Sequence, residues 1–138
     1  MVILYDRFNL PEDVYEIIFA TKQQAIVGKL LINYLKENER EITKTEMSIF
    51  ATSLHEGELF ADGEVIGINA KKVKFSYNKR QFYDRILTPM KSMGLINYDL
   101  YKKTYKLSEN FNKEQMRIGL LWLRELRKPA LNLKVKSK

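Results

Sequence analysis

The sequence contains no cysteine, a single histidine (His55) and none of the glycine-rich phosphate-binding motifs. Without cysteine there is no disulfide framework, no thiol nucleophile and no cysteine-ligated metal. A lone histidine gives no multi-histidine metal site, and near a helix end we expect it to be structural. The missing glycine-rich loops remove a cradle for nucleotide phosphates. We therefore predict no enzyme activity, catalytic residue, metal site, cofactor or small-molecule substrate.

Long apolar runs are also missing, and none approaches the roughly 20 residues of a membrane span. The first six residues lack the basic start and apolar stretch of a signal peptide, so we expect a cytoplasmic protein without a membrane partner. Only 3 prolines and 6 glycines, with 45% hydrophobic residues, predict a folded chain. A length of 138 residues predicts one domain over 1–128 and a basic, mobile tail over 129–138.

Acidic residues are scarce in the second half of the chain. Residues 71–138 hold 18 Lys or Arg and 5 Asp or Glu, whereas residues 1–70 hold 6 and 12. The halves carry charges of +13 and −6, which together give the net charge of +7. A cationic half attracts nucleic acid, an anionic membrane surface or an acidic protein, and charge alone does not choose among them.

Hydrophobic spacing predicts a mainly helical α+β protein with a small β component. A first helix is expected from a start signal at 9–13 to about Lys36, with apolar residues recurring at helical spacing. Thr43 and Glu46 match a capping box and predict a second helix over 44–54. That helix is expected to bury Met47, Phe50, Ala51 and Leu54.

The stretch from 56 to 75 is ambiguous. Asp62-Gly63 between residues 59–61 and 64–66 is typical of a tight β-hairpin, because both turn positions favour positive φ. The sequence leaves open whether an extra hairpin or an unrecognised helix fills this stretch.

A third helix is predicted over about 78–93, begun either by Ser76 or by Asn78, which has Gln81 three residues on, and closed by Gly94. Pro89 predicts a kink or a tightened turn around 85–88. One face is expected to pack in the core, and it consists of Phe82, Ile86, Met90 and Met93. The opposite face consists of Arg80, Gln81, Asp84, Thr88 and Lys91. A basic hairpin follows over about 95–107, with strands at 95–98 and 104–107.

This order of elements, and the segments Met93-Gly94-Leu95-Ile96 and Tyr105-Lys106-Leu107-Ser108, resemble the winged helix-turn-helix DNA-binding superfamily. The resemblance implies a winged helix with helical extensions at both ends. It also implies that helix 78–93 is a recognition helix for the major groove and that hairpin 95–107 is a wing on the DNA backbone. The family usually joins its second and third helices by a short turn, whereas about 20 residues intervene here.

The predicted DNA contacts lie on the recognition helix and the wing. Arg can grip guanine and Gln can grip adenine through paired hydrogen bonds in the major groove. The predicted contact residues are Asn78, Lys79, Arg80, Gln81, Tyr83, Asp84, Arg85, Lys102, Lys103 and Thr104. The alternatives are a solvated helix face with an Arg80–Asp84 ion pair and a wing that serves only as a solubilising turn.

The final helix, from about 111 to 127, is apolar nearly all round between Ile118 and Leu123. One domain face cannot readily absorb such a helix, so we predict a homodimer through Met116, Leu120 and Leu123. The alternative is that residues 2–8 cover the second face within one monomer.

The sequence therefore predicts a sequence-specific protein for double-stranded DNA, a homodimeric transcriptional regulator located in the cytoplasm at the nucleoid. A plasmid or viral replication or partition protein is an alternative within DNA binding. A winged-helix module for protein–protein interaction is the alternative outside it.

Overall fold

The computed structural model describes residues 7–8, 12–57, 59–61 and 73–132. It is mainly helical with a small three-stranded antiparallel sheet, which confirms the α+β class. The chain divides into two compact units, residues 1–108 and 109–138. The division falls inside the domain predicted over 1–128, and that assignment stays a prediction. Most of the predicted mobile tail, residues 133–138, lies outside the described residues.

The first predicted helix is two helices, α1 (Val14–Ile18) and α2 (Lys22–Glu37). Prediction of a single helix was wrong because the chain carries two caps. The Asp13 carboxylate accepts a hydrogen bond from the Tyr15 N–H at 3.0 Å, and Thr21 Oγ1 accepts one from the Gln24 N–H at 3.1 Å. Phe19, between them, is extended and buried. Each cap satisfies a free backbone N–H at a helix start, so the chain begins a helix at two places.

The second helix, α3 (Lys44–His55), has the predicted capping box, with Thr43 and Glu46 each accepting a hydrogen bond from the other's backbone N–H. Its four predicted core residues are all buried. The sequence did not predict the strand before it, β1 (Glu41–Thr43), in which only Ile42 is buried. Three residues are too short for alternation to be noticed.

The third helix consists of three segments, α5 (Lys79–Gln81), the π-helical η1 (Phe82–Leu87) and α6 (Thr88–Ser92). Asn78 caps Gln81 as predicted, and Gly94 has a φ of 82°. The predicted tightened turn near Pro89 is wrong, because the turn is widened. The Thr88 N–H donates to the Tyr83 carbonyl five residues back. Proline cannot donate and its ring crowds the carbonyl four residues earlier, and a wider turn relieves both constraints.

The sheet contains β1 and the hairpin strands β4 (Ile96–Asp99) and β5 (Thr104–Leu107), in the order β1-β5-β4. The predicted hairpin is confirmed, and β1 adds a third strand to it. Ile42 and Tyr98 both pair with Tyr105 in the register. These residues lie on the sheet face that packs on the helices.

Between α3 and α5 in the sequence, the chain forms a second, two-stranded sheet. In it β2 (Leu59–Ala61) pairs with β3 (Val73–Phe75), with Leu59 opposite Phe75. The predicted turn at Asp62-Gly63 and its strand over 64–66 lie outside the described residues.

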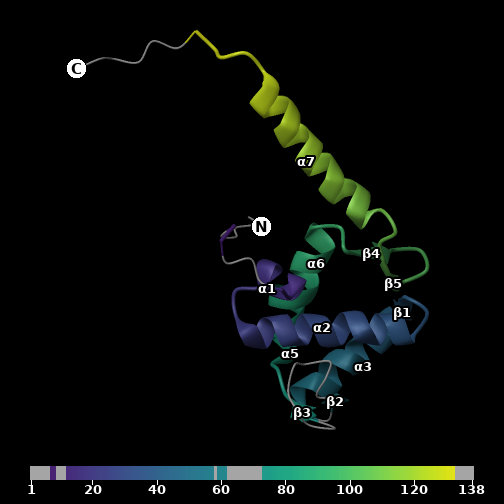
Figure 1. Ribbon diagram of the computed structural model, residues 1–138. Helices are drawn as coiled ribbons and strands as arrows, with labels where there is room; N and C mark the ends of the chain where they lie inside the picture. The colour runs from purple at the N-terminus through teal and green to yellow at the C-terminus, as the bar shows by residue number, and fades with distance from the viewer. Residues whose placement is uncertain (1–6, 9–11, 58, 62–72, 133–138) are drawn as a thin grey trace. The chain divides into compact units, whose positions relative to one another are not determined.

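The core of the first unit lies around α2, which crosses the middle of that unit with α6 on one side and α3 on the other (Figure 1). Its fully buried side chains include Val27, Leu31, Leu35, Met47, Leu54, Phe82, Ile86 and Met90. Gly28 lets Phe19 approach α2 closely. A Cβ atom at Gly28 would clash with Phe19 Cε2, its nearest neighbour, and would lie 2.9 Å from Phe19 Cζ and 3.1 Å from Met90 Cε. The glycine is therefore a packing requirement in this helix.

The second unit contains the helix α7 (Phe111–Arg127), with the bounds expected from the sequence, followed by residues 128–132, which belong to no helix or strand. No residue of α7 is buried. Within the described ranges, no helix is long and apolar enough to cross a membrane.

Candidate nucleic-acid interface

The third helix separates its apolar and polar side chains as the sequence predicted. Phe82, Ile86 and Met90 are fully buried, and Met93 is half-buried. The exposed face consists of Arg80, Gln81, Asp84, Arg85, Thr88 and Lys91. Leu87 is buried as well, although regular helical spacing places it away from Phe82. The π-helical turn rotates less per residue than an α-helical turn, so Leu87 lies on the side of the helix that faces the core.

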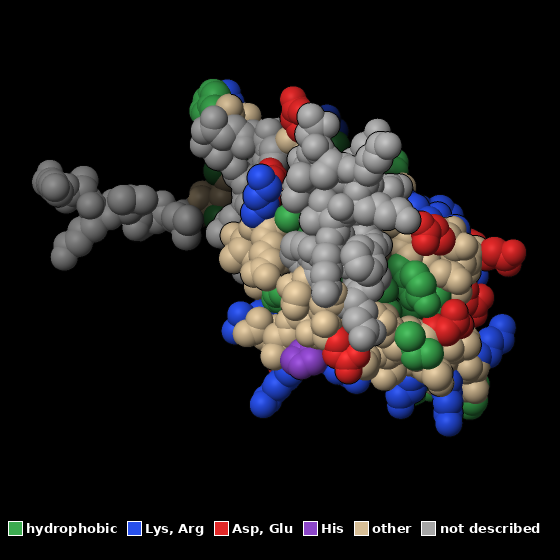
Figure 2. Space-filling view, turned by 90° about the horizontal axis from the view of Figure 1, so that it is seen from below, with side chains coloured by type: hydrophobic (Ala, Val, Ile, Leu, Met, Phe, Trp, Pro, Cys, Tyr) green, Lys and Arg blue, Asp and Glu red, His purple; other side chains and the backbone are tan. Residues whose placement is uncertain are grey.

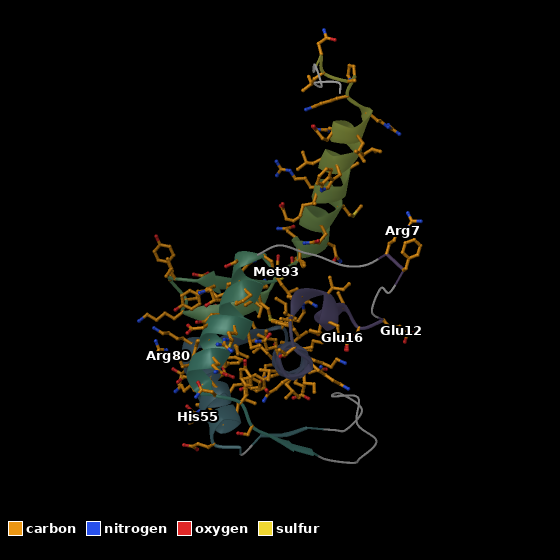
Figure 3. All side chains as sticks on the ribbon, turned by 90° about the vertical axis from the view of Figure 1, so that its left-hand side faces the viewer. Arg7, Glu12, Glu16, His55, Arg80 and Met93 are labelled. Carbon is orange, nitrogen blue, oxygen red and sulfur yellow. The ribbon has the colours of Figure 1, made fainter. Side chains whose placement is uncertain are left out.

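Arg80 and Asp84 form the predicted i, i+4 ion pair, but it is weak. The Arg80 Nε to Asp84 Oδ2 distance is 3.9 Å, and the two side chains are 92% and 69% exposed. Pairs this open to water contribute at most about 0.5 kcal/mol. The guanidinium therefore stays available to a ligand and projects from the body of the unit in Figure 3.

Lys79 has partners inside the protein. Its Nζ donates to Thr52 Oγ1 at 2.9 Å, and its backbone N–H donates to His55 Nδ1 at 3.1 Å. The Tyr77 N–H donates to the Leu54 carbonyl at 3.0 Å. Together these bonds dock the start of the third helix on the end of α3. Lys79 is thus a poorer candidate for ligand contact than Arg80.

Sequence reasoning missed this docking because the partners lie 24 and 27 residues apart. Figure 2 shows the exposed His55 in purple, with Lys and Arg side chains in blue projecting along the same edge of the view. The imidazole acts there as an acceptor for a helix start, a role usually taken by Ser, Thr, Asp or Asn.

Three tyrosines connect the third helix to the sheet. The Tyr98 and Tyr105 ring centroids are 4.6 Å apart, and Lys91 Nζ lies 5.5 Å and 5.9 Å from them. Burial raises the pKa of the Tyr105 hydroxyl, and the nearby hydroxyls of Tyr83 and Tyr98 raise it further. A lysine over two ring faces is held by cation–π attraction. Lys91 therefore ties the end of the third helix to the sheet.

The β4–β5 turn is held at both ends. Asp99 Oδ1 accepts hydrogen bonds from the Tyr101 N–H at 2.9 Å and the Lys102 N–H at 3.1 Å. At the other end the Lys103 carbonyl accepts a bond from the Lys44 N–H at 2.9 Å, and Lys103 has a φ of 54°. The turn is thus ordered by side-chain and backbone bonds, and Lys102 and Lys103 remain exposed.

Thr104, at the start of β5, is half-buried and pairs with Thr43 and Asp99 in the sheet. The structure therefore brings the predicted helix residues and the predicted turn lysines into one unit. At the helix start the backbone N–H of Gln81 donates to Asn78 Oδ1. The side-chain amide of Gln81, which is exposed, takes no part in that bond.

Cations dominate the exposed side chains of these elements. Arg80, Arg85, Lys91, Lys102 and Lys103 carry positive charge, against Asp84 and Asp99. Asp99 is engaged with backbone donors. In the described part of the chain, no group of three or more His, Asp or Glu side chains could hold a metal ion.

The residues predicted for a dimer are exposed on α7. They are Met116, Leu120 and Leu123, and the apolar residues Ile118, Trp122 and Leu126 of the same helix are exposed as well. Lys113, Arg117 and Arg124 lie within about 40° of one another around the helix, and Leu120 lies beside them. No family model, curated protein or solved structure matches this chain.

Proposed function

We propose that this protein is a winged helix that binds double-stranded DNA in a sequence-specific manner as a transcriptional regulator. The observation that carries the proposal is the pairing, within one unit, of the exposed face of the third helix with a basic β4–β5 hairpin. The helix is packed through Phe82, Ile86 and Met90, and its polar side chains face outward. An outward helix face of this kind fits a major groove about 12 Å wide.

In this proposal Arg80 and Gln81 read base edges near the start of the recognition helix. Arg matches guanine O6 and N7, and Gln matches adenine N6 and N7. Asp84 then orients Arg80 rather than neutralising it, since their atoms are 3.9 Å apart and exposed. Arg85 and Tyr83 flank the groove at sugar and phosphate positions.

The hairpin takes the role of the wing. Lys102 and Lys103 contact phosphates, and the bond from the Lys44 N–H to the Lys103 carbonyl holds the wing beside the start of α3. Each phosphate contact releases counterions, so affinity falls steeply with salt. Backbone contacts of this sort set register and leave base choice to the helix.

We further propose that α7 joins two copies through Met116, Leu120 and Leu123. The apolar side chains of this helix are exposed and extend beyond one stripe, and a second copy offers an equal surface. A two-fold dimer would place the recognition helices about one DNA turn apart, which predicts half-sites centred roughly 10 base pairs apart. The protein would act in the cytoplasm, at the nucleoid.

The test is selection of duplexes from a random library by the full chain, followed by anisotropy titrations across salt. The winning duplex should bind about 10³-fold or more tightly than a scrambled one. Arg80→Ala should relax preference at one base position. Lys102→Ala should weaken all duplexes alike and reduce the salt slope by about one. Lys36→Ala, an exposed charge on α2, is the matched control and should change neither.

Unchanged base preference in Arg80→Ala would show that the recognition helix is wrongly chosen. An enriched motif in repeats would redirect the proposal to replication or partition. Absence of any enriched motif, with binding that vanishes near physiological salt, would refute DNA recognition. A stable complex with an acidic protein would then support the protein-interaction alternative.

A further inference from the structure

The tip of the β4–β5 hairpin carries two exposed apolar side chains in sequence. Leu100 is 76% exposed and Tyr101 is 99% exposed. Single exposed apolar residues are ordinary on protein surfaces. Turn tips, however, are usually built from Gly, Asn, Asp, Ser or Pro, and this tip has a leucine and a tyrosine where small polar residues would serve.

The tip is also ordered before any partner arrives. Asp99 binds the N–H groups of Tyr101 and Lys102, and the Lys103 carbonyl is bonded to the Lys44 N–H. Ordering a loop on binding costs conformational entropy, and a turn already held at both ends avoids most of that cost. The apolar pair is therefore presented on a firm base.

The surroundings of the pair indicate the chemistry of its partner. Lys102 and Lys103 follow directly, so the partner must combine anionic groups at the surface with an apolar interior reached between them. The minor groove of duplex DNA has this combination, with phosphates on both rims and stacked bases at its floor. An anionic membrane surface has it too.

Duplex DNA is favoured because the hairpin shares a side of the unit with the exposed face of the recognition helix. Arg80 and the β4–β5 hairpin project toward the same side in Figure 3. Lys91 links the two, since its Nζ lies on the rings of Tyr98 and Tyr105 in the hairpin. A duplex with its major groove on the helix would bring the adjacent minor groove toward the tip.

We propose that the tip inserts Leu100 and Tyr101 into the minor groove, parts a base step and kinks the duplex. This inference rests on the proposed function and adds DNA bending to it. Apolar wedges between base steps kink DNA by roughly 20–90° toward the major groove.

The experiment measures bending with the full chain and the selected duplex, labelled with donor and acceptor dyes at its two ends. At saturating protein, energy transfer should rise by the amount that a kink of roughly 20–90° predicts. The double variant Leu100→Ser, Tyr101→Ser should lose the rise and bind about tenfold more weakly. Because both side chains are exposed, its melting temperature should equal that of the wild type.

Lys102→Gln with Lys103→Gln is the matched control from the same turn. It should weaken binding and lower the salt slope, yet bend the duplex fully once saturated. The two variants therefore separate phosphate contact from insertion.

Saturation of the duplex by the wild type without a bend would overturn insertion and leave the proposed function intact. The same follows if the serine variant bends DNA as the wild type does. Failure to bind any duplex would overturn both proposals. Sedimentation with phosphatidylserine vesicles that the serine variant abolishes, in a protein that does not bend DNA, would assign the tip to a membrane surface instead.

Discussion

Replacement of Gly28 by alanine tests the closest packing contact in the first unit. Gly28 lies within α2, where alanine is ordinarily the better residue by about 1 kcal/mol. Helix propensity alone therefore predicts that Gly28→Ala stabilises the protein. The structure predicts the opposite, because the new methyl group would meet the ring of buried Phe19 and the end of Met90.

The size of the destabilisation depends on which neighbouring side chain can move away from the new methyl group. Met90 Cε, at 3.1 Å, ends a flexible side chain and can move by a few tenths of an ångström. The Phe19 ring, with Cζ at 2.9 Å, is rigid and sits in the short connection between α1 and α2. Overpacking of a core costs about 1–3 kcal/mol, and contact with a rigid ring whose Cε2 atom lies even closer than Cζ places this site at about 2–3 kcal/mol. After the gain in propensity is subtracted, we expect a net loss of about 1–2 kcal/mol.

Thermal unfolding followed by circular dichroism measures this loss, and roughly 5–10 °C of melting temperature should disappear. Gly119→Ala is the matched control, because it is also a glycine within a helix but has no heavy atom within 4 Å of the added methyl. It should leave the melting temperature unchanged or raise it. Phe19→Leu combined with Gly28→Ala should be less destabilised than the sum of the single variants by about 1 kcal/mol.

A melting temperature for Gly28→Ala at or above that of the wild type would refute the reasoning, since Phe19 could not then rest on α2. Strict additivity in the double variant would mean that the loss arises elsewhere.

Three further perturbations have expected outcomes. Thr43→Ala should cost about 1 kcal/mol in urea unfolding by removing the capping box, whereas Thr45→Ala in the same turn should be nearly neutral. His55→Ala should cost about 0.5–1.5 kcal/mol by the same assay, because the Lys79 N–H loses its acceptor; an unchanged midpoint would show that water replaces it. Burial raises the pKa of Asp13. An ion pair with Lys29 of α2, whose Nζ lies 2.8 Å from Asp13 Oδ2, and a hydrogen bond from the Tyr15 N–H outweigh burial and leave the pKa below its ordinary value of 3.8. As pH falls, the Asp13 carboxylate is therefore protonated in the unfolded chain before it is protonated in the folded protein. Its contribution to the free energy of unfolding is present above about pH 4 and is lost as pH falls through the pKa of the folded state. Asp13→Asn should therefore reduce the loss of stability at acid pH, measured by urea unfolding across pH.

Features that depend on neighbours in the sequence were predictable. The capping box and the cap at Asn78 each join residues three apart, and Gly94 closes its helix by its own φ. Burial of Phe82, Ile86 and Met90 followed from helical spacing. These outcomes depend on local geometry, which the order of residues expresses directly.

Features that depend on distant partners were not predictable. β1 is a strand because β5, about 60 residues later, supplies its hydrogen bonds, and its three residues show no pattern of their own. The Lys79 bonds to α3 likewise join separate elements. The π turn was misjudged because Pro89 excludes regular helix without specifying whether the turn narrows or widens.

The place of β1 in the sheet sets an order for folding. The β4–β5 hairpin joins residues close in the chain and can form early, but β1 must wait for β5, because closing so long a loop costs more entropy before any bond rewards it. During synthesis Ile42 therefore stays without its sheet partner until residue 107 has left the ribosome. A chain interrupted before that point would expose an unpaired strand edge, whereas a chain that extends through Ser108, whose N–H donates to the Leu95 carbonyl, contains every paired residue of the sheet.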